Sequence, residues 1–427
     1  MKKLVAVLIV SLLCISAAHS QPQAPLVARI NQAAALFRSD PGGFDTLFTS
    51  SFLNQVSPSQ LSAYSSELFT NNGSVTSWRY LDSSKAWSAK VQLMFSKGFS
   101  VDMSLAVTET APHLIQGLLL GAPTPQMKTM DEIITKLSGL RGTTAFLAAK
   151  LGTSGIEPIA QLHPDSAMAL GSAFKLYVLA TLLHDINAGK RHWSDVVELD
   201  SATRAFPSGE MHAWPIGSPV TLATAATLMI SISDNTATDL LIHTLGRENI
   251  EAILREAGNT HAERDMPFLT TLEMFKLKSK GLRLGKKYVQ QTLTGKRAFL
   301  AKDVAEFPRD SVTLGSEVAM IDKIEWFASP RDIANVLIYL RDNSVSGEGK
   351  KVRDILAVNP GLSFDKKHWD FVGYKGGSEP GVLNQSFLLR AKSGEWYVLT
   401  GSWNDPNLAL TDSDFEGIMQ RAAELLP

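Results

Sequence analysis

The stretch "ALGSAFKLYVLATLLHDI" (169–186) is a nearly continuous apolar run that carries a serine and a lysine close to its start. Its length and apolar content predict a buried helix, and Gly171 suits a sharp turn into that helix. Ser172 and Lys175 are three positions apart, so a helix places them on one face, about one turn from each other. A lysine whose pKa is lowered by burial can act as the base that a serine nucleophile needs. By itself the pattern is short, and a serine cap followed by a lysine that reaches solvent explains it more simply.

Two further segments supply partners for this pair. In "SISDNTATDLL" (231–241), the tripeptide S-D-N begins at Ser233, just before an apolar helical run. In "DFVGYKGGSEPG" (370–381), the tripeptide K-G-G begins at Lys375, at the end of an apolar strand. A helix cap and a strand followed by a turn would explain these two segments separately. In this order, however, the three motifs resemble the S-x-x-K, S-D-N and K-T-G set of serine penicillin-recognising enzymes.

The resemblance extends beyond the motifs. Residues 217–246 and 328–340 are similar to the corresponding helices of class A β-lactamases, a family whose members act on β-lactam amide bonds. The resemblance implies that Ser172 is the acylated nucleophile and Lys175 its general base partner. It also implies that Ser233 passes a proton to the leaving nitrogen.

The same resemblance implies a substrate-binding set. Asn235 would hydrogen-bond the substrate side chain, and Lys375 would attract the substrate carboxylate. Gly377 and Ser378 follow on the strand of Lys375 and complete this set. The backbone N–H groups of Ser172 and of a residue on that strand, for which we expect Ser378, would form the oxyanion hole.

Two departures from the family pattern affect the expected chemistry. Gly376 stands at the middle position of K-T-G, so the hydroxyl that helps to bind the carboxylate is missing. Ser378 lies on the same face of the strand, but two residues move the hydroxyl by about 6–7 Å. Class A enzymes carry an E-x-x-L-N loop, whose glutamate activates the deacylating water. This loop has no counterpart between Asn235 and Lys375. The similar string "EPGVLN", which begins at Glu379, is one residue too long and follows the third motif.

Four carboxylates remain as candidates for the deacylating base, although each is more simply explained as an ordinary surface or capping residue. They are Glu263, Asp265, Glu273 and Glu325. Without such a base, an acyl-enzyme formed from a β-lactam would persist.

Composition excludes several other functions. The 427 residues carry a net charge of -1 and no basic block, so a nucleic-acid partner is not expected. The nine histidines show no metal-binding spacing, and neither a metal nor another cofactor is expected. The one cysteine, Cys14, lies in the N-terminal segment and leaves the rest of the chain without a thiol or disulfide.

The first twenty residues are typical of a secretory signal. Lys2 and Lys3 precede an apolar run, and small residues stand before the expected cleavage site, so that the mature chain would start near Gln21. The apolar run is too short to span a bilayer comfortably. Acylation of Cys14 in a lipoprotein is the weaker alternative, because leucines occupy the positions before it. We expect a periplasmic or secreted protein.

The rest of the sequence predicts two α+β domains. Residues 21–123 contain helical segments followed by four alternating segments, which predict an antiparallel meander, and "GAPTPQ" (121–126) is the expected linker. Residues 124–427 begin and end with strands and have helices between them, which predicts an antiparallel sheet built from distant segments, flanked by helices and joined to an all-helical subdomain. The whole chain resembles β-lactamase-like proteins with an N-terminal steroid-isomerase-like or cystatin-like domain, a group represented in the clavulanic-acid biosynthesis cluster.

We therefore expect an exported serine hydrolase that acts on a small-molecule β-lactam through an acyl-serine, with a role in β-lactam breakdown and the antibiotic response. Three alternatives remain open: a D,D-peptidase acting on a peptidoglycan-type peptide, an esterase of the same fold, and a binding protein that keeps the pocket without turnover. The N-terminal domain is expected to bind a small molecule or protein and to narrow access to the cleft. The sequence leaves open the physiological substrate, the deacylating group and the oligomeric state.

Overall fold

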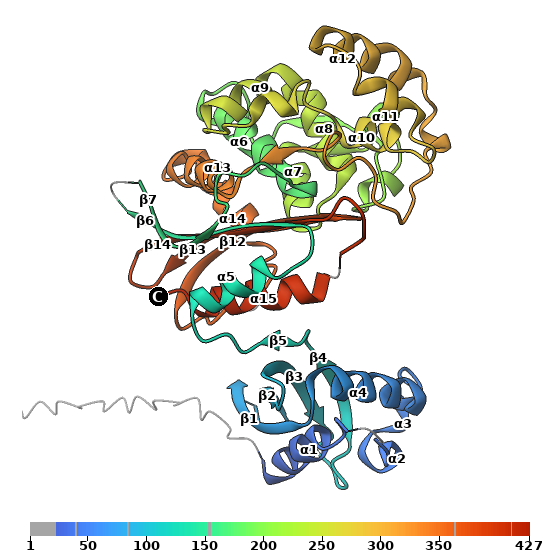
Figure 1. The fold of residues 1–427 in the computed structure, drawn as a ribbon, viewed down its shortest axis with the longest axis vertical. Helices are drawn as coiled ribbons and strands as arrows, with labels where there is room; N and C mark the ends of the chain where they lie inside the picture. The colour runs from blue at the N-terminus through green and yellow to red at the C-terminus, as the bar shows by residue number, and fades with distance from the viewer. Residues whose placement is uncertain (1–22, 39–40, 83–84, 153–154, 363, 411) are drawn as a thin grey trace, which may run out of the picture. The chain divides into compact units, whose positions relative to one another are not determined.

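The computed structural model describes residues 23–427, apart from 39–40, 83–84, 153–154, 363 and 411 (Figure 1). The predicted signal at 1–20 lies outside the described residues. The chain divides into two compact units, the first ending at Gln126 and the second beginning at Met127. Within the described part of the chain, every helix is too short or too polar to cross a bilayer.

The described part of the first unit consists of four helices followed by a meander. Its helices are α1 (Ala24–Ala34), α2 (Phe44–Leu47), α3 (Ser50–Leu53) and α4 (Pro58–Asn72), and its strands are β1 (Val75–Asp82), β2 (Ser88–Phe95), β3 (Phe99–Val107), β4 (Ile115–Leu120) and β5 (Thr124–Pro125). The antiparallel order β1-β2-β3-β4 confirms the predicted meander. Part of the expected linker, residues 121–126, belongs to this unit instead, because Thr124 and Pro125 pair with Ser100 and Phe99 of β3. Ser57 caps α4, and its side chain forms a reciprocal capping box with Gln60.

The second unit is built on one antiparallel sheet whose strands come from both ends of its sequence. These strands are β6 (Thr143–Gly152), β7 (Gly155–Leu162), β12 (Trp369–Glu379), β13 (Val382–Ala391) and β14 (Trp396–Asn404), in the spatial order β12-β13-β14-β6-β7. β14, near the end of the unit, pairs with β6, near its start. This pairing confirms the predicted sheet built from distant segments. β12, which carries the K-G-G motif, is at one edge of this sheet.

Helices cover both faces of this sheet (Figure 1). α5 (Met130–Ser138) and α15 (Asp412–Glu424) lie on one face, and α6 (Lys175–Asn187) and α13 (Pro330–Asp342) belong to the helical side on the other. Successive side chains of a strand point to opposite faces. Accordingly, Phe146 and Ala148 of β6 join the core under α5 and α15, whereas Leu147 and Ala149 join the core on the helical side. Burial on both faces explains why β6 is apolar almost throughout.

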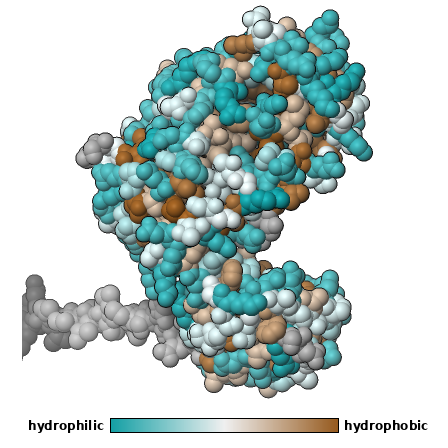
Figure 2. Space-filling model, in the orientation of Figure 1, coloured by the Kyte–Doolittle hydropathy of each residue, from teal (hydrophilic) through white to brown (hydrophobic). Residues whose placement is uncertain are grey.

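The helical side is completed by short elements between the two halves of the sheet. The remaining helices are α7 (Leu222–Ser231), α8 (Asn235–Leu245), α9 (Arg247–Glu256), α10 (Thr271–Leu277), α11 (Arg283–Tyr288), α12 (Leu293–Phe299) and α14 (Lys351–Ala357). Two short ladders join β8 (Met168–Ala169) to β11 (Phe327–Ala328) and β9 (Val196–Glu198) to β10 (Pro219–Thr221). On the visible face, hydrophilic residues are interspersed with hydrophobic ones (Figure 2).

The basic and weakly periodic sequence of residues 279–316 favours a solvated surface excursion, but the segment is more ordered than that. It forms α11 and α12 with a π-helical turn at Leu300–Val304. Tyr288 and Phe299 are buried in the core of the helical side, while the lysines of these helices point outward or lie at its margin. Part of the segment therefore packs against the core instead of being a solvated excursion.

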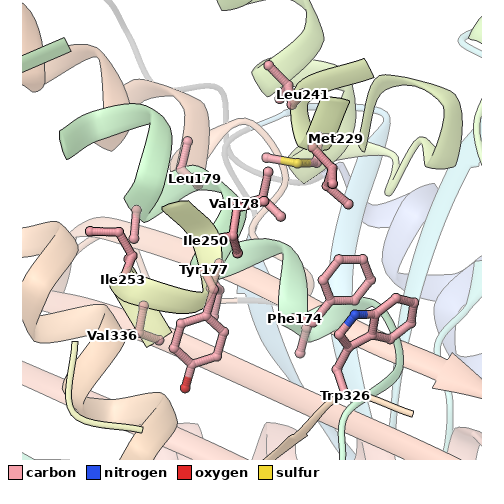
Figure 3. Packing of buried hydrophobic residues seen from close by; sticks show 14 of the residues in the cluster. Phe174, Tyr177, Val178, Leu179, Met229, Leu241, Ile250, Ile253, Trp326 and Val336 are labelled. Atoms are coloured by element: carbon pink, nitrogen blue, oxygen red, sulfur yellow. The ribbon is translucent and has the colours of Figure 1, made fainter. Parts of the chain in front are cut away.

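The turn that carries Ser172 is anchored by aromatic packing in this core. Phe174 is 1% exposed and stacks on Trp326, with a centroid separation of 3.6 Å. Phe268 meets the Phe174 ring edge-on at 5.7 Å. Figure 3 shows Phe174 and Trp326 side by side, and Tyr177 further along α6. Since Phe174 is two residues after Ser172, this stack fixes the position of the turn in the fold.

We expect Phe174→Ala to lower the free energy of unfolding by about 3–5 kcal/mol, because it removes a buried ring and leaves a cavity beside Trp326. Urea unfolding followed by tryptophan fluorescence measures this change. Val345→Ala is the control: Val345 is 61% exposed, and its truncation should change stability by less than about 0.5 kcal/mol. Equal effects of the two substitutions would contradict the anchoring role of the stack.

Candidate active site

Ser172 lies in a tight turn between a short strand and a long helix. β8 ends at Ala169, a 3₁₀ turn spans Gly171–Phe174, and α6 begins at Lys175. Gly171 has a φ of 51°, which confirms the predicted need for glycine at the entry to the helix. In a 3₁₀ turn the side chains at i and i+3 eclipse each other, so Ser172 and Lys175 share one side of the chain.

Ser233 and Asn235 are held by the aspartate between them. Ser233 has a φ of 57°, a strained conformation for a residue with a side chain, and α8 begins two residues later. Asp234 is fully buried and caps α8 by accepting a hydrogen bond from the Ala237 N–H at 2.8 Å. Its second oxygen accepts hydrogen bonds from the N–H groups of Glu210 and Met211 at 2.7 and 2.8 Å. Asp234 thus fixes both flanking residues of the S-D-N motif.

The three sequence motifs meet at the Ser233 hydroxyl. Lys175 Nζ donates to Ser233 Oγ at 3.0 Å and to the Ser233 carbonyl at 2.7 Å. Lys375 Nζ donates to the same Oγ at 3.1 Å and to the Gly376 carbonyl at 2.6 Å. Lys175 Nζ also donates to Asn235 Oδ1 at 2.7 Å. One hydroxyl therefore bridges two lysines from segments far apart in the sequence.

Burial of both lysines lowers their affinity for protons. Lys175 is fully buried, and this burial, together with the charge of Lys375, holds the pKa of Lys175 well below its usual value. Lys375 is 3% exposed, and burial lowers its pKa to about 7. Asp234 and Asp239 partly oppose the shift at Lys175, because their charges favour its protonated form. A lysine of this kind can accept a proton from a hydroxyl near neutral pH.

Two backbone N–H groups converge where β12 passes the Ser172 turn. A Cβ atom on Gly377 would lie 2.1 Å from the Leu170 carbonyl oxygen and 2.5 Å from the Ser172 nitrogen, so only glycine permits this approach. On the other side, a Cβ on Gly171 would lie 2.9 Å from the Ser378 nitrogen. The Ser172 and Ser378 nitrogens are thus near the same crossing of the two segments, which suits stabilisation of an oxyanion.

A cleft of about 810 Å³ opens beside this crossing. It is lined by six of the seven residues predicted for the site: Ser172, Ser233, Asn235, Lys375, Gly377 and Ser378. Lys175, the seventh, is buried behind Ser233 and is not part of the lining. A serine near a buried amine, with two N–H groups close by, has the parts that acyl transfer requires.

The four candidate carboxylates occupy different places. The Glu263 side chain is 77% exposed and pairs with Arg255. The other two outside the cleft are structural: Asp265 accepts a hydrogen bond from the Phe327 N–H at 2.7 Å, and Glu273 closes the capping box of α10. Only Glu325 lines the cleft with Ser172.

Among the charged residues that line the cleft, sequence reasoning missed Lys278 and left Glu379 unplaced. Lys278, which no motif indicated, is buried between Glu325 and Glu379 and lines the cleft with them. Glu379 was considered only as the first residue of "EPGVLN", an imperfect match to E-x-x-L-N. Counting every second residue along β12 from Lys375 places Gly377 and Glu379 on the same face, a signal that was present in the sequence.

Comparisons with known proteins give one family and a set of similar structures. The model of the beta-lactamase enzyme family matches residues 127–400, which fall in the second unit. A search of the curated proteins finds no match.

The similar structures include two β-lactamases and PBP-A. The β-lactamase from Sphaerobacter thermophilus DSM 20745 is 19% identical, with coverage of 70% of this chain and 98% of that one and a TM-score of 0.49. The β-lactamase from Desulfarculus baarsii DSM 2075 is 16% identical, with coverage of 70% and 98% and a TM-score of 0.48. PBP-A is 16% identical, with coverage of 69% and 94% and a TM-score of 0.46.

We expect Asp234→Ala to lower the free energy of unfolding by about 2–4 kcal/mol, because it removes a helix cap and leaves two further N–H groups without an acceptor. Thr221→Ala is the matched control: Thr221 caps α7 by accepting from one N–H group, that of Thr224, and also hydrogen-bonds the Thr224 hydroxyl. Its substitution should cost about 1 kcal/mol. Urea denaturation of both variants measures the difference. A cost for Asp234→Ala no larger than that for Thr221→Ala would show that Asp234 does not organise the motif.

Proposed function

The chain belongs to the beta-lactamase enzyme family, and on that premise we propose that it is an exported serine hydrolase of the class A type, which cleaves β-lactam amide bonds through an acyl-Ser172 intermediate. The observation that carries this proposal is the Ser233 hydroxyl bridged between Lys175 and Lys375, beside the turn of Ser172. This network connects a buried base with a proton carrier and a cation that line the cleft.

Acylation follows from these positions. Lys175, as the neutral amine, takes the proton of Ser172 while Oγ attacks the carbonyl carbon of the β-lactam. The N–H groups of Ser172 and Ser378 stabilise the oxyanion that forms. The proton then passes from Lys175 through the Ser233 hydroxyl to the ring nitrogen, the carbon–nitrogen bond breaks, and the acyl group remains on Ser172 Oγ.

Substrate binding uses the other two polar residues of the cleft. Lys375, when protonated, attracts the carboxylate that penicillins and cephalosporins carry. Asn235 Oδ1 accepts a hydrogen bond from Lys175, which leaves the Asn235 amide N–H₂ to donate to the substrate side chain. Because Gly376 lacks a hydroxyl, carboxylate binding depends mainly on Lys375, with the exposed Ser378 as a second donor.

Export and the first unit complete the proposal. The signal-like segment 1–20 directs the chain to the periplasm or the medium, and cleavage leaves a mature start near Gln21. The unit ending at Gln126 is a binding module of the steroid-isomerase-like or cystatin-like type.

Intact-protein mass spectrometry over time with a penicillin, a cephalosporin and a simple ester tests the acyl-serine directly. We expect the mass of one acyl group to be added to the protein, and Ser172→Ala to abolish this adduct. Ser201→Ala is the control, because Ser201 is exposed and lies outside the cleft. No adduct and no product with any of the three compounds would contradict the proposed function, and an ester adduct alone would assign the site to an esterase.

The pH dependence of kcat/KM tests the role of Lys375. The pKa of Lys375 is about 7, so this lysine is cationic below that pH and loses its charge above it. For a cephalosporin with a free carboxylate we expect kcat/KM to fall about tenfold per pH unit on the alkaline side. The methyl ester of the same cephalosporin lacks the anion and should show no such fall. The same alkaline limb with both compounds would contradict the assignment of the carboxylate to Lys375.

A further inference from the structure

Three buried ionisable groups beside the Ser172 turn have no role in the acylation described above. Lys278 Nζ donates to Glu325 Oε1 at 3.2 Å and to Glu379 Oε1. The side chains of Lys278, Glu325 and Glu379 are 4%, 0% and 13% exposed. Buried charges are costly unless they are paired, and here two carboxylates share one ammonium group. Because this costly cluster lies beside the nucleophile, it is a candidate for a role in the reaction.

The cluster is attached directly to the segments that form the oxyanion site. Glu325 Oε2 accepts hydrogen bonds from the N–H groups of Gly171 and Trp326, both at 3.1 Å. Gly171 precedes Ser172, and Trp326 forms the aromatic stack that anchors the turn. On the other side, Glu379 follows Ser378 on β12, and all three members of the cluster line the cleft that contains Ser172.

The two carboxylates differ in their access to water. Glu325 has no exposed surface, and it already accepts hydrogen bonds from two N–H groups and from Lys278. Glu379 retains some exposure, and the alternation of side chains along β12 places it on the face of Lys375 and Gly377, toward the Ser172 turn. Glu379 is therefore the carboxylate that a water molecule in the cleft can reach.

We propose that Glu379 is the general base that activates water for hydrolysis of the acyl-Ser172 ester, and that Lys278 and Glu325 are positioning residues that hold its carboxylate. The proposal rests on the proposed function, because it concerns the second half of the same reaction. The proposal assigns the role of the glutamate in the E-x-x-L-N loop to a residue at another position in the sequence. That loop has no counterpart between Asn235 and Lys375.

Glu379 takes a proton from water while the water oxygen attacks the ester carbonyl carbon, and the oxyanion is held by the N–H groups of Ser172 and Ser378. The tetrahedral intermediate then collapses with cleavage of the bond between that carbon and Ser172 Oγ. Glu379 returns the proton to the serine oxygen, and the carboxylic acid product ionises on release.

The electrostatics of the cluster agree with this role. Burial, followed by the charge of Glu325, raises the pKa of Glu379 well above its usual value, and Lys278 opposes part of that rise. A carboxylate with a raised pKa is a stronger base and can hold the proton of water until the intermediate collapses. Because only the ionised form accepts a proton, deacylation should accelerate as the pH rises through the pKa of Glu379.

Glu379→Gln in the full-length protein tests the proposal, with acylation and deacylation measured separately by rapid-quench mass spectrometry using a penicillin. We expect acylation within a few-fold of the unchanged protein and deacylation slowed by about 10²–10⁴-fold, so that the adduct accumulates. The acid limb of the deacylation profile should disappear in this variant and shift in Lys278→Met. Glu263→Gln makes the same chemical change at an exposed carboxylate and should alter neither step.

Each outcome either supports or overturns the assignment of Glu379 as the general base. Accumulation of the acyl-enzyme in Glu379→Gln alone supports the proposal, and partial recovery of deacylation in Glu379→Asp strengthens it. Deacylation by Glu379→Gln at the unchanged rate overturns it, as does loss of acylation in the same variant, which would mean that Glu379 only builds the site. An unchanged protein that acylates but never deacylates overturns this inference and leaves the acyl-serine intact, whereas one that never acylates refutes the proposed function itself.

Discussion

The Ser233 hydroxyl between Lys175 and Lys375 is the interaction on which the arrangement of the cleft depends. Each lysine comes from a different structural element, one from the start of α6 and one from the edge strand β12, and Ser233 belongs to the loop before α8. These three segments come together only when the sheet is closed and the helical side is packed onto it. The site is therefore a consequence of tertiary structure, although its residues lie in short motifs.

Such an arrangement is costly. For Lys375, a pKa lowered from 10.5 to about 7 corresponds to a loss of about 5 kcal/mol in the preference for the charged form. Lys175 bears a further penalty from the charge of Lys375, and Ser233 adds a left-handed backbone conformation. Stabilisation must come from elsewhere: from the Phe174–Trp326 stack and the apolar core around α6, and from the cap that Asp234 places on α8. This separation of cost and stabilisation is typical of catalytic sites, where the residues that react are not those that stabilise the fold.

The sequence predicted what local chemistry determines and missed what long-range packing determines. Strand segments at both ends of residues 124–427 predicted the antiparallel sheet, and the suitability of glycine beside Ser172 followed from its position at a sharp turn. Lys278 could not be found in this way, because "KLKSKG" (276–281) resembles the solvated end of a helix. Its partners, Glu325 and Glu379, are 47 and 101 residues away, and only their packing makes Lys278 a buried residue.

Two groups of ionisable residues lie near Ser172, and they suit a reaction in two steps. One group joins Lys175 and Lys375 through the Ser233 hydroxyl, and the other joins Glu325 and Glu379 through Lys278. A neutral amine serves the first step, because it becomes a cation while the substrate becomes an oxyanion, so the charges that form attract each other. In the second step the amine has already given its proton to the leaving nitrogen, and an attacking water approaches from elsewhere. A separate carboxylate avoids competition between the two steps for one base. The Ser172 turn, hydrogen-bonded through Gly171 to Glu325 and leading directly into Lys175, is the element that connects the two groups.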